Sequence, residues 1–91
     1  MAFEVVISPR AFREYKKLPE GIKDGVRIAV DSLKHEPLKG GSIKKLQGAL
    51  REYHRYRIGD YRVLYSVDIK EKKVYVDSVR HRRDVYKKAG R

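Results

Sequence analysis

Three arginines near the middle of the chain predict a surface that binds anions. Two strand-like segments are joined there by Gly59-Asp60, which suits a two-residue type II′ hairpin turn because glycine is favoured at its first position. In that register Arg57 lies directly opposite Arg62, and strand alternation puts Arg55 on the same face. Guanidinium groups bind phosphate oxygens through paired hydrogen bonds, so the face suits a polyanion.

Folding alone gives no reason to place these arginines together. Like charges opposite each other across two strands destabilise a sheet. A solvated face on a generally basic protein is the alternative interpretation, and the arginines by themselves do not decide between the two. Strand alternation sends the other face to the core, with His54 as a structural residue. The predicted inward residues are Tyr56, Ile58, Tyr61, Val63 and Tyr65.

Composition favours a phosphate polymer as the partner. The 91 residues fit one domain, residues 1–91, and carry 23 Lys and Arg against 12 Asp and Glu, a net charge of +11. No apolar stretch reaches the roughly 20 residues that span a membrane, and the start of the chain lacks a signal-peptide pattern, so we expect a cytoplasmic protein without membrane contacts. The absence of cysteine and the scattered histidines predict neither a disulfide nor a metal site, and no cofactor is expected.

The elements that must position the arginines begin with a strand over 3–7. Ser8 is a favoured helix N-cap and Pro9 a favoured first helical residue, so a helix follows at once. A second helix runs to about His35 and is closed by Pro37. Both helices carry apolar stripes that are typical of packing against a sheet.

The rest of the chain predicts an antiparallel meander. Residues 38–50 read as an irregular loop, and the strands are expected over 53–58, 61–65 and 74–79, with a turn at 70–72. Adding the first strand at an edge gives a four-stranded, mostly antiparallel sheet. With the N-terminal helical pair packed on one face, the expected fold is a two-layer α+β sandwich.

A basic tail follows the last strand and leaves the sheet beside the arginine face, with a short helix expected from Asp84. Clustered cations of this kind bind RNA backbones without sequence preference. The residues predicted to contact RNA in this way are Lys44, Lys45, Arg80, Arg83, Lys87 and Lys88.

Two motifs together resemble the RelE toxins of the RelE/ParE superfamily. They are Tyr-Arg-Ile-Gly-Asp-Tyr-Arg-Val-Leu-Tyr at 56–65 and Val-Arg-His-Arg-Arg-Asp-Val-Tyr at 79–86, and 44–48 is similar to the segment that commonly precedes them. The resemblance covers nearly the whole chain. It implies a RelE-like fold and an endoribonuclease that cuts mRNA in the ribosomal A site. It also implies a small RelB-like antitoxin that holds the enzyme inactive.

Position by position, the resemblance assigns catalytic roles to the arginine face and to the tail. Well-studied members carry lysines where this chain has Arg55 and Arg57, and an arginine is a poor general base because its pKa lies above roughly 12. His81 is a candidate for proton transfer, because the side chain of histidine has an intrinsic pKa near 6.5. The predicted catalytic residues are Arg55, Arg57, Arg62, His81, Arg82 and Tyr86.

The function that follows is ribosome-dependent and metal-independent cleavage of mRNA by attack of an RNA 2′-hydroxyl on the adjacent phosphate. The expected partners are the antitoxin, the ribosome and mRNA. Two other functions stay open. One is a ParE-like inhibitor of DNA gyrase on the same fold, and the other is an RNA-binding module without catalysis, in which the arginines clamp phosphate and Tyr86 stacks on a base.

Overall fold

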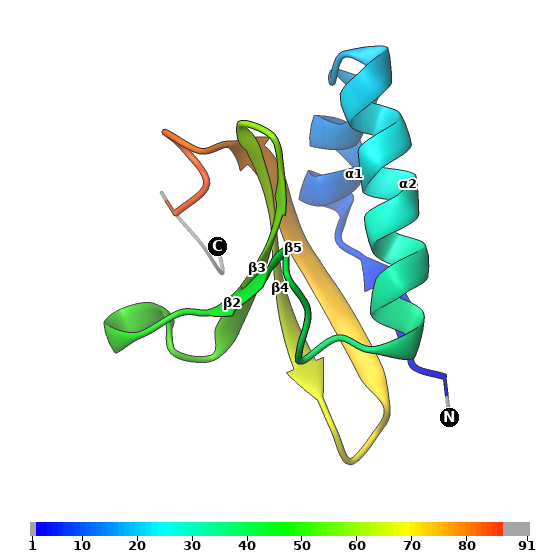
Figure 1. The fold of residues 1–91 in the computed structure, drawn as a ribbon, viewed down its shortest axis with the longest axis vertical. Coiled ribbons are helices and arrows are strands. Elements are labelled where there is room, and N and C mark those ends of the chain that lie inside the picture. The colour runs from blue at the N-terminus through cyan, green and yellow to red at the C-terminus, as the bar shows by residue number, and fades with distance from the viewer. Residues whose placement is uncertain (1, 87–91) are drawn as a thin grey trace.

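The computed structural model describes residues 2–86 of the chain (Figure 1). Along the chain, the first of five strands is followed by two helices, a short second strand, one 3-10 turn and the last three strands. Their bounds are β1 Glu4–Ile7, α1 Pro9–Lys16, α2 Glu20–His35, β2 Ile43–Lys45, η1 Gly48–Leu50, β3 Tyr53–Ile58, β4 Tyr61–Asp68 and β5 Lys73–His81.

The strands form one mixed sheet in the order β1-β5-β4-β3-β2, in which β1 runs parallel to β5 and the other neighbours are antiparallel. The predicted meander is present, but the predicted count of four strands is wrong because the described residues contain five. The added strand, β2, lies in the segment that we expected to be a loop. It is three residues long and pairs with β3, Ile43 with Tyr56 and Lys44 with Arg55. So short a strand carries no recognisable periodicity, and pairing with β3 is what orders it.

The helix boundaries agree with the sequence signals. The Ser8 side chain accepts a hydrogen bond from the Ala11 N–H at 3.0 Å, Pro9 begins α1, and α2 ends at His35. The expected helix from Asp84 is absent from the described residues, which form turns as far as Tyr86. The rest of that segment, including Lys87 and Lys88, lies outside the described residues.

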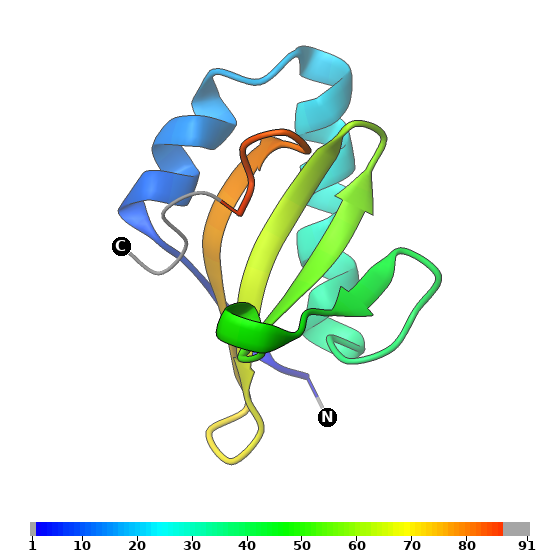
Figure 2. The same ribbon diagram turned by 90° about the vertical axis from the view of Figure 1, so that its left-hand side faces the viewer.

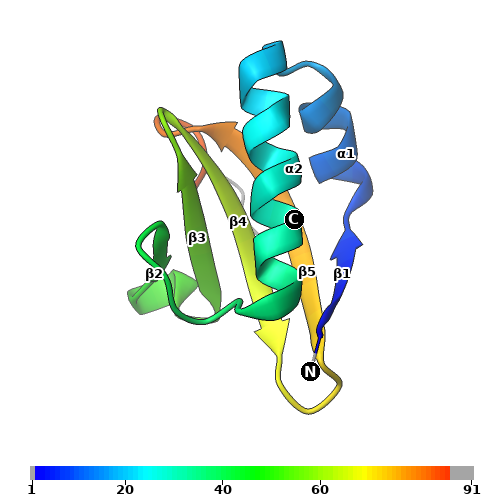
Figure 3. The ribbon, with the colours of Figure 1, turned by 45° about the vertical axis from the view of Figure 1, so that its right-hand side comes forward.

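Both helices lie on the same side of the sheet (Figures 1 and 3). Tyr65 lies in the main core and its hydroxyl donates to the Pro37 carbonyl at 2.7 Å. Each fully buried aliphatic side chain contributes about 1.5–3 kcal/mol, so the packing of this face strongly favours folding. No helix of residues 2–86 is long and apolar enough to cross a membrane. The buried core residues are Ala11, Val26, Leu33, Val63, Tyr65, Val74, Val76 and Val79.

His54 lies on the core side of β3, as predicted. Its side chain is buried, and its ring stacks on Tyr65 with 5.6 Å between the centroids. Burial lowers the pKa of His54, and the positive charge of Lys45 lowers it further. The folded protein therefore favours the neutral imidazole, which makes His54 a structural residue.

This lowered pKa predicts a pH dependence of stability. The unfolded chain takes up a proton at His54 near pH 6.5, whereas the folded chain resists protonation, so the free energy of unfolding should fall as pH drops below about 6.5. Urea denaturation between pH 5 and 8 measures the slope. His54→Phe should reduce the slope, whereas His35→Gln, at an exposed histidine, should not. An unchanged slope in His54→Phe would show that another group titrates.

Candidate functional site

The hairpin turn sets the register of the candidate site. Gly59 has φ +56° and Asp60 has a negative φ, as a type II′ turn requires, and Arg57 pairs with Arg62 across β3 and β4. Arg62 also pairs with Arg80 of β5, so the three arginines form a row across three strands. Strand alternation places this row on the face opposite to Val63 and the helices.

Backbone carbonyls hold two of the arginines in place. One terminal nitrogen of Arg62, Nη1, donates to the Gly59 carbonyl at 2.8 Å and to the Tyr61 carbonyl at 3.0 Å. Arg55 Nη1 donates to the Ser42 carbonyl, beside β2, at 2.8 Å. Each contact uses only part of a guanidinium that has five N–H donors, so donors remain for a ligand.

Arg57 is the most available of the strand arginines. It is exposed, and its side chain makes no hydrogen bond or ion pair with any other residue between 2 and 86. Lys44 is also exposed, and it lies opposite Arg55 on the same face. The face therefore presents positive charge that the described carboxylates leave largely uncompensated.

The turn at 82–86 brings a further arginine and a tyrosine to this face. The Arg82 N–H donates to the Asp60 carbonyl at 2.7 Å, and Arg82 Nε lies 3.7 Å from Asp60 Oδ1. Val85 is fully buried, which anchors the turn, while Tyr86 stays 43% exposed. Figure 2 looks onto the sheet face away from the helices, where this red segment folds over the strands.

The charges of these neighbouring groups act together on Arg62. Burial lowers the pKa of Arg62, and the charges of Arg55, Arg57 and Arg82 lower it further. The Tyr86 side chain acts in the opposite direction. We call Arg55, Arg57, Arg62 and Arg82 the arginine cluster. A guanidinium stays protonated at any physiological pH, so the cluster is a permanent positive field with a tyrosine beside it.

His81 does not join the arginine cluster. It pairs with Tyr61 on the other side of the strand, where the two rings meet edge to face with 5.5 Å between the centroids. Its Nδ1 accepts a hydrogen bond from the Arg83 N–H at 3.3 Å. Five of the six predicted catalytic residues therefore come together, and His81 lies apart from them.

The predicted RNA contacts are also dispersed. Lys45 shares the side of His54, and its Nζ donates to the Arg51 carbonyl. Arg80 forms a hydrogen-bonded ion pair with Glu14 of α1, whereas Arg83 is exposed on the turn. Among the described residues of this set, Lys44 lies on the strand face of the arginine cluster, whereas Arg80 pairs with Arg62 on that face but turns its guanidinium to Glu14.

Sequence reasoning missed two acidic residues that organise the site. Asp60 was assigned only to the turn, although it pairs with Arg82 through both its carbonyl and its carboxylate. Glu14 was part of a helix with no assigned chemistry. A turn aspartate beside several arginines is a usable signal for the first, but nothing local points from Glu14 to Arg80, 66 positions away.

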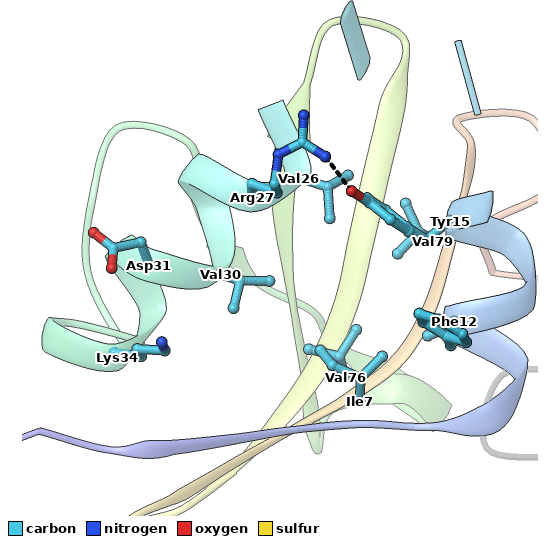
Figure 4. Close-up of a pocket in the computed structure, with 11 residues that line it drawn as sticks. Ile7, Phe12, Tyr15, Val26, Arg27, Val30, Asp31, Lys34, Val76 and Val79 are labelled. Atoms are coloured by element: carbon cyan, nitrogen blue, oxygen red, sulfur yellow. Dashed lines mark hydrogen bonds between the residues drawn. The ribbon is translucent and has the colours of Figure 1, made fainter. Parts of the chain in front are cut away.

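The opposite side of the molecule carries an apolar groove of about 330 Å³ between α1, α2 and the sheet edge. Figure 4 shows that its walls are mainly aliphatic and aromatic, with Ile7 and Phe12 at 40% and 52% exposure, and with Arg27 donating to the Tyr15 hydroxyl. The helix stripes that we predicted to be core therefore also line an open surface. Within residues 2–86 no group of three or more histidine or acidic side chains is arranged to hold a metal ion.

Known proteins are similar to this chain in sequence and in fold. The family model of the ParE toxin of the type II toxin–antitoxin system parDE matches residues 5–86. Toxin RelG of Mycobacterium tuberculosis is 35% identical over 97% of this chain and 100% of its own. A chain of the RelBE2 toxin–antitoxin complex from the same organism is 32% identical with a TM-score of 0.77, over 89% of this chain and 99% of that chain.

An archaeal relative agrees with this assignment. A chain of the RelE–RelB complex from Pyrococcus horikoshii is 29% identical with a TM-score of 0.78, over 90% of this chain and 97% of that chain. The match to the family model spans most of the described residues, and the similarity to RelG spans nearly the whole chain. The chain therefore belongs to the toxins of type II toxin–antitoxin systems and is a RelE-like member of the RelE/ParE superfamily.

Proposed function

We propose that this protein inhibits translation by cutting mRNA in the ribosomal A site, and that the arginine cluster carries the reaction. The observation that supports the proposal is the gathering of four arginines and Tyr86 on one sheet face. Because like charges across strands oppose folding, a polyanionic ligand is the reason for such a face. The family membership and the similarity to RelE toxins support the same reaction.

The proposed reaction needs three kinds of help. The RNA 2′-oxygen attacks the adjacent phosphorus as it loses its proton, the bond to the 5′-oxygen breaks, and that oxygen gains a proton, leaving a 2′,3′-cyclic phosphate. The attacking hydroxyl must be aligned, the added negative charge must be stabilised, and two protons must move. Planar guanidinium forks suit the second task, with Arg57 and Arg62 reaching the phosphate from the strands and Arg82 from the turn.

Proton transfer is the weaker part of this site. Arginines are poor bases, and we leave His81 out because it lies apart from the cluster. Tyr86 is the proton-carrying side chain beside Arg62, and it can also stack on a nucleobase. We infer that the ribosome supplies the remaining help by holding the message so that the 2′-hydroxyl is in line with the leaving oxygen.

A second candidate function is ParE-like inhibition of DNA gyrase, which the match to the ParE family model favours. Gyrase binding requires no cluster of opposed arginines, so we rank it below RNA cleavage. An RNA-binding module without catalysis would use the same face as a phosphate clamp. The experiments below separate the three.

The antitoxin is the proposed regulatory partner. The relatives solved as RelBE2 and RelE–RelB complexes support it, and the net charge of +11 attracts an acidic chain. The apolar groove suits the apolar face of an amphipathic segment, since it is open, lined by Ile7 and Phe12, and rimmed by Asp31 and Lys34. We propose that a segment of the antitoxin docks there.

Substituting Arg62 or Arg82 by Ala should abolish growth inhibition without unfolding the protein. Each loses a charge-assisted contact made mainly in the transition state, which costs roughly 2–4 kcal/mol, or about 30- to 1,000-fold in cleavage rate. Arg13→Ala, an exposed arginine of α1, removes the same charge and should stay toxic. Full toxicity of a stably folded double variant would exclude both residues from the mechanism.

Cleavage should require ribosomes. Mapping of mRNA 5′ ends after adding purified protein to a translation reaction, with and without ribosomes and with a chelator, tests this directly. Cuts in both reactions would identify a free ribonuclease, and loss of ribosome-free cutting with chelator would contradict a metal-independent reaction. Inhibition of gyrase supercoiling without RNA cuts would favour the ParE-like function. RNA binding without cuts would favour the RNA-binding module without catalysis.

Phe12→Asp should weaken antitoxin binding by about 30-fold or more, because it places a charge where an aromatic anchor is expected. Ile28→Asp is the matched control, since Ile28 is 67% exposed on α2 and does not line the groove. Binding titrations against the product of the adjacent reading frame, repeated at rising salt, measure both effects. Equal losses in the two variants, or a gene without any neutralising neighbour, would contradict the docking proposal.

A further inference from the structure

We propose that Glu14 is a positioning residue that acts through Arg80 to hold the turn at 82–86 over the arginine cluster. The inference rests on the proposed function and extends it. It gives Arg80 a role within the protein in place of the phosphate or ribosome contact that the sequence predicts.

The position of Glu14 follows from a gap at the sheet edge. β1 pairs with β5 only as far as Val76, whereas β5 continues to His81. Polar groups at the start of α1 and within it take over from the missing strand. The Ser8 N–H donates to the Val76 carbonyl at 3.0 Å, and Glu14 Oε1 accepts from the Val79 N–H at 2.9 Å. Because an unpartnered buried N–H is costly, this bond fixes the Glu14 carboxylate at the edge.

The second oxygen of the same carboxylate binds Arg80. Arg80 Nε donates to Glu14 Oε2, and the two side chains are only 20% and 22% exposed, so water and salt screen the pair less than a surface pair. Arg80 Nη1 also donates to the Asp84 carbonyl at 3.5 Å. One guanidinium therefore joins α1 to the middle of the turn that carries Arg82 and Tyr86.

The ion pair between Glu14 and Arg80 also distinguishes Arg80 from the other arginines of its row. Arg57, Arg62 and Arg80 form one row across three strands. Of these three, Arg80 alone has an ion pair with a described carboxylate. Glu14 thus directs Arg80 to the strand edge, while Arg57 and Arg62 stay on the face of the arginine cluster.

A spin label on the turn tests the positioning role without any need for activity. The chain has no cysteine, so Arg83→Cys introduces a single labelling site on an exposed part of the turn. In this labelled protein, Glu14→Gln should increase label mobility. Glu20→Gln is the matched control, because it makes the same chemical change in a carboxylate that pairs with Lys23 and is 84% exposed. It should leave mobility unchanged.

Unlabelled variants then measure the effect on cleavage. Glu14→Gln should lower kcat by about 10- to 100-fold with little change in KM, because the turn is displaced while the strand arginines still bind RNA. Arg80→Gln and the double variant should lose no more than Glu14→Gln, since the two residues act as a unit. Arg80→Gln keeps the bond between Glu14 and Val79, and it repeats the mobility test if Glu14→Gln does not fold.

Two results would overturn the proposal. One is equal label mobility in the Glu14→Gln, Arg80→Gln and Glu20→Gln proteins. The other is an additive loss in the double variant together with a raised, salt-dependent KM for Arg80→Gln, which would make Arg80 a phosphate ligand. A wild-type protein that cuts no RNA would refute the proposed function alone, because the mobility comparison does not depend on cleavage.

Discussion

The two-residue turn at Gly59-Asp60 is the constraint on which the site depends. Glycine at φ +56° allows the tight reversal, and the reversal sets Arg57 opposite Arg62. The turn also holds both arginines. The Gly59 carbonyl accepts from the Arg62 guanidinium, the Asp60 carbonyl accepts from the Arg82 backbone N–H, and the Asp60 carboxylate lies near Arg82 Nε. A one-residue change in register would send the arginines to the core side and remove every one of these contacts.

The sheet can carry such a charged face because its other face is well packed. Val63 and Tyr65 of β4 are fully buried against the helices, and they alternate in sequence with the arginine side. Their burial offsets the repulsion between opposed arginines, which is modest for exposed groups in water. The packed face and the cationic face thus lie on opposite sides of the same two strands.

Acidic residues decide what each arginine can do. Asp60 holds Arg82 within the arginine cluster and Glu14 turns Arg80 towards the strand edge, whereas Arg57 has no carboxylate partner among residues 2–86. In a protein with a net charge of +11, the few carboxylates thus have a large influence on which cations face a ligand. The total charge favours a polyanion, but the acidic partners decide which arginines are left available to one.

The sequence by itself determined the two helices, four of the five strands and the face of the strand arginines, because helix caps, strand alternation and a glycine turn are local signals. Ser8 caps α1, α2 ends at His35 just before Pro37, and Gly59 adopts a positive φ, each as expected. Tertiary structure alone decided the rest. β2 exists because β3 offers it a partner, Glu14 meets a residue 66 positions away, and the register of β5 separates His81 from the cluster. Such contacts depend on how distant segments pack, and no local pattern encodes that packing.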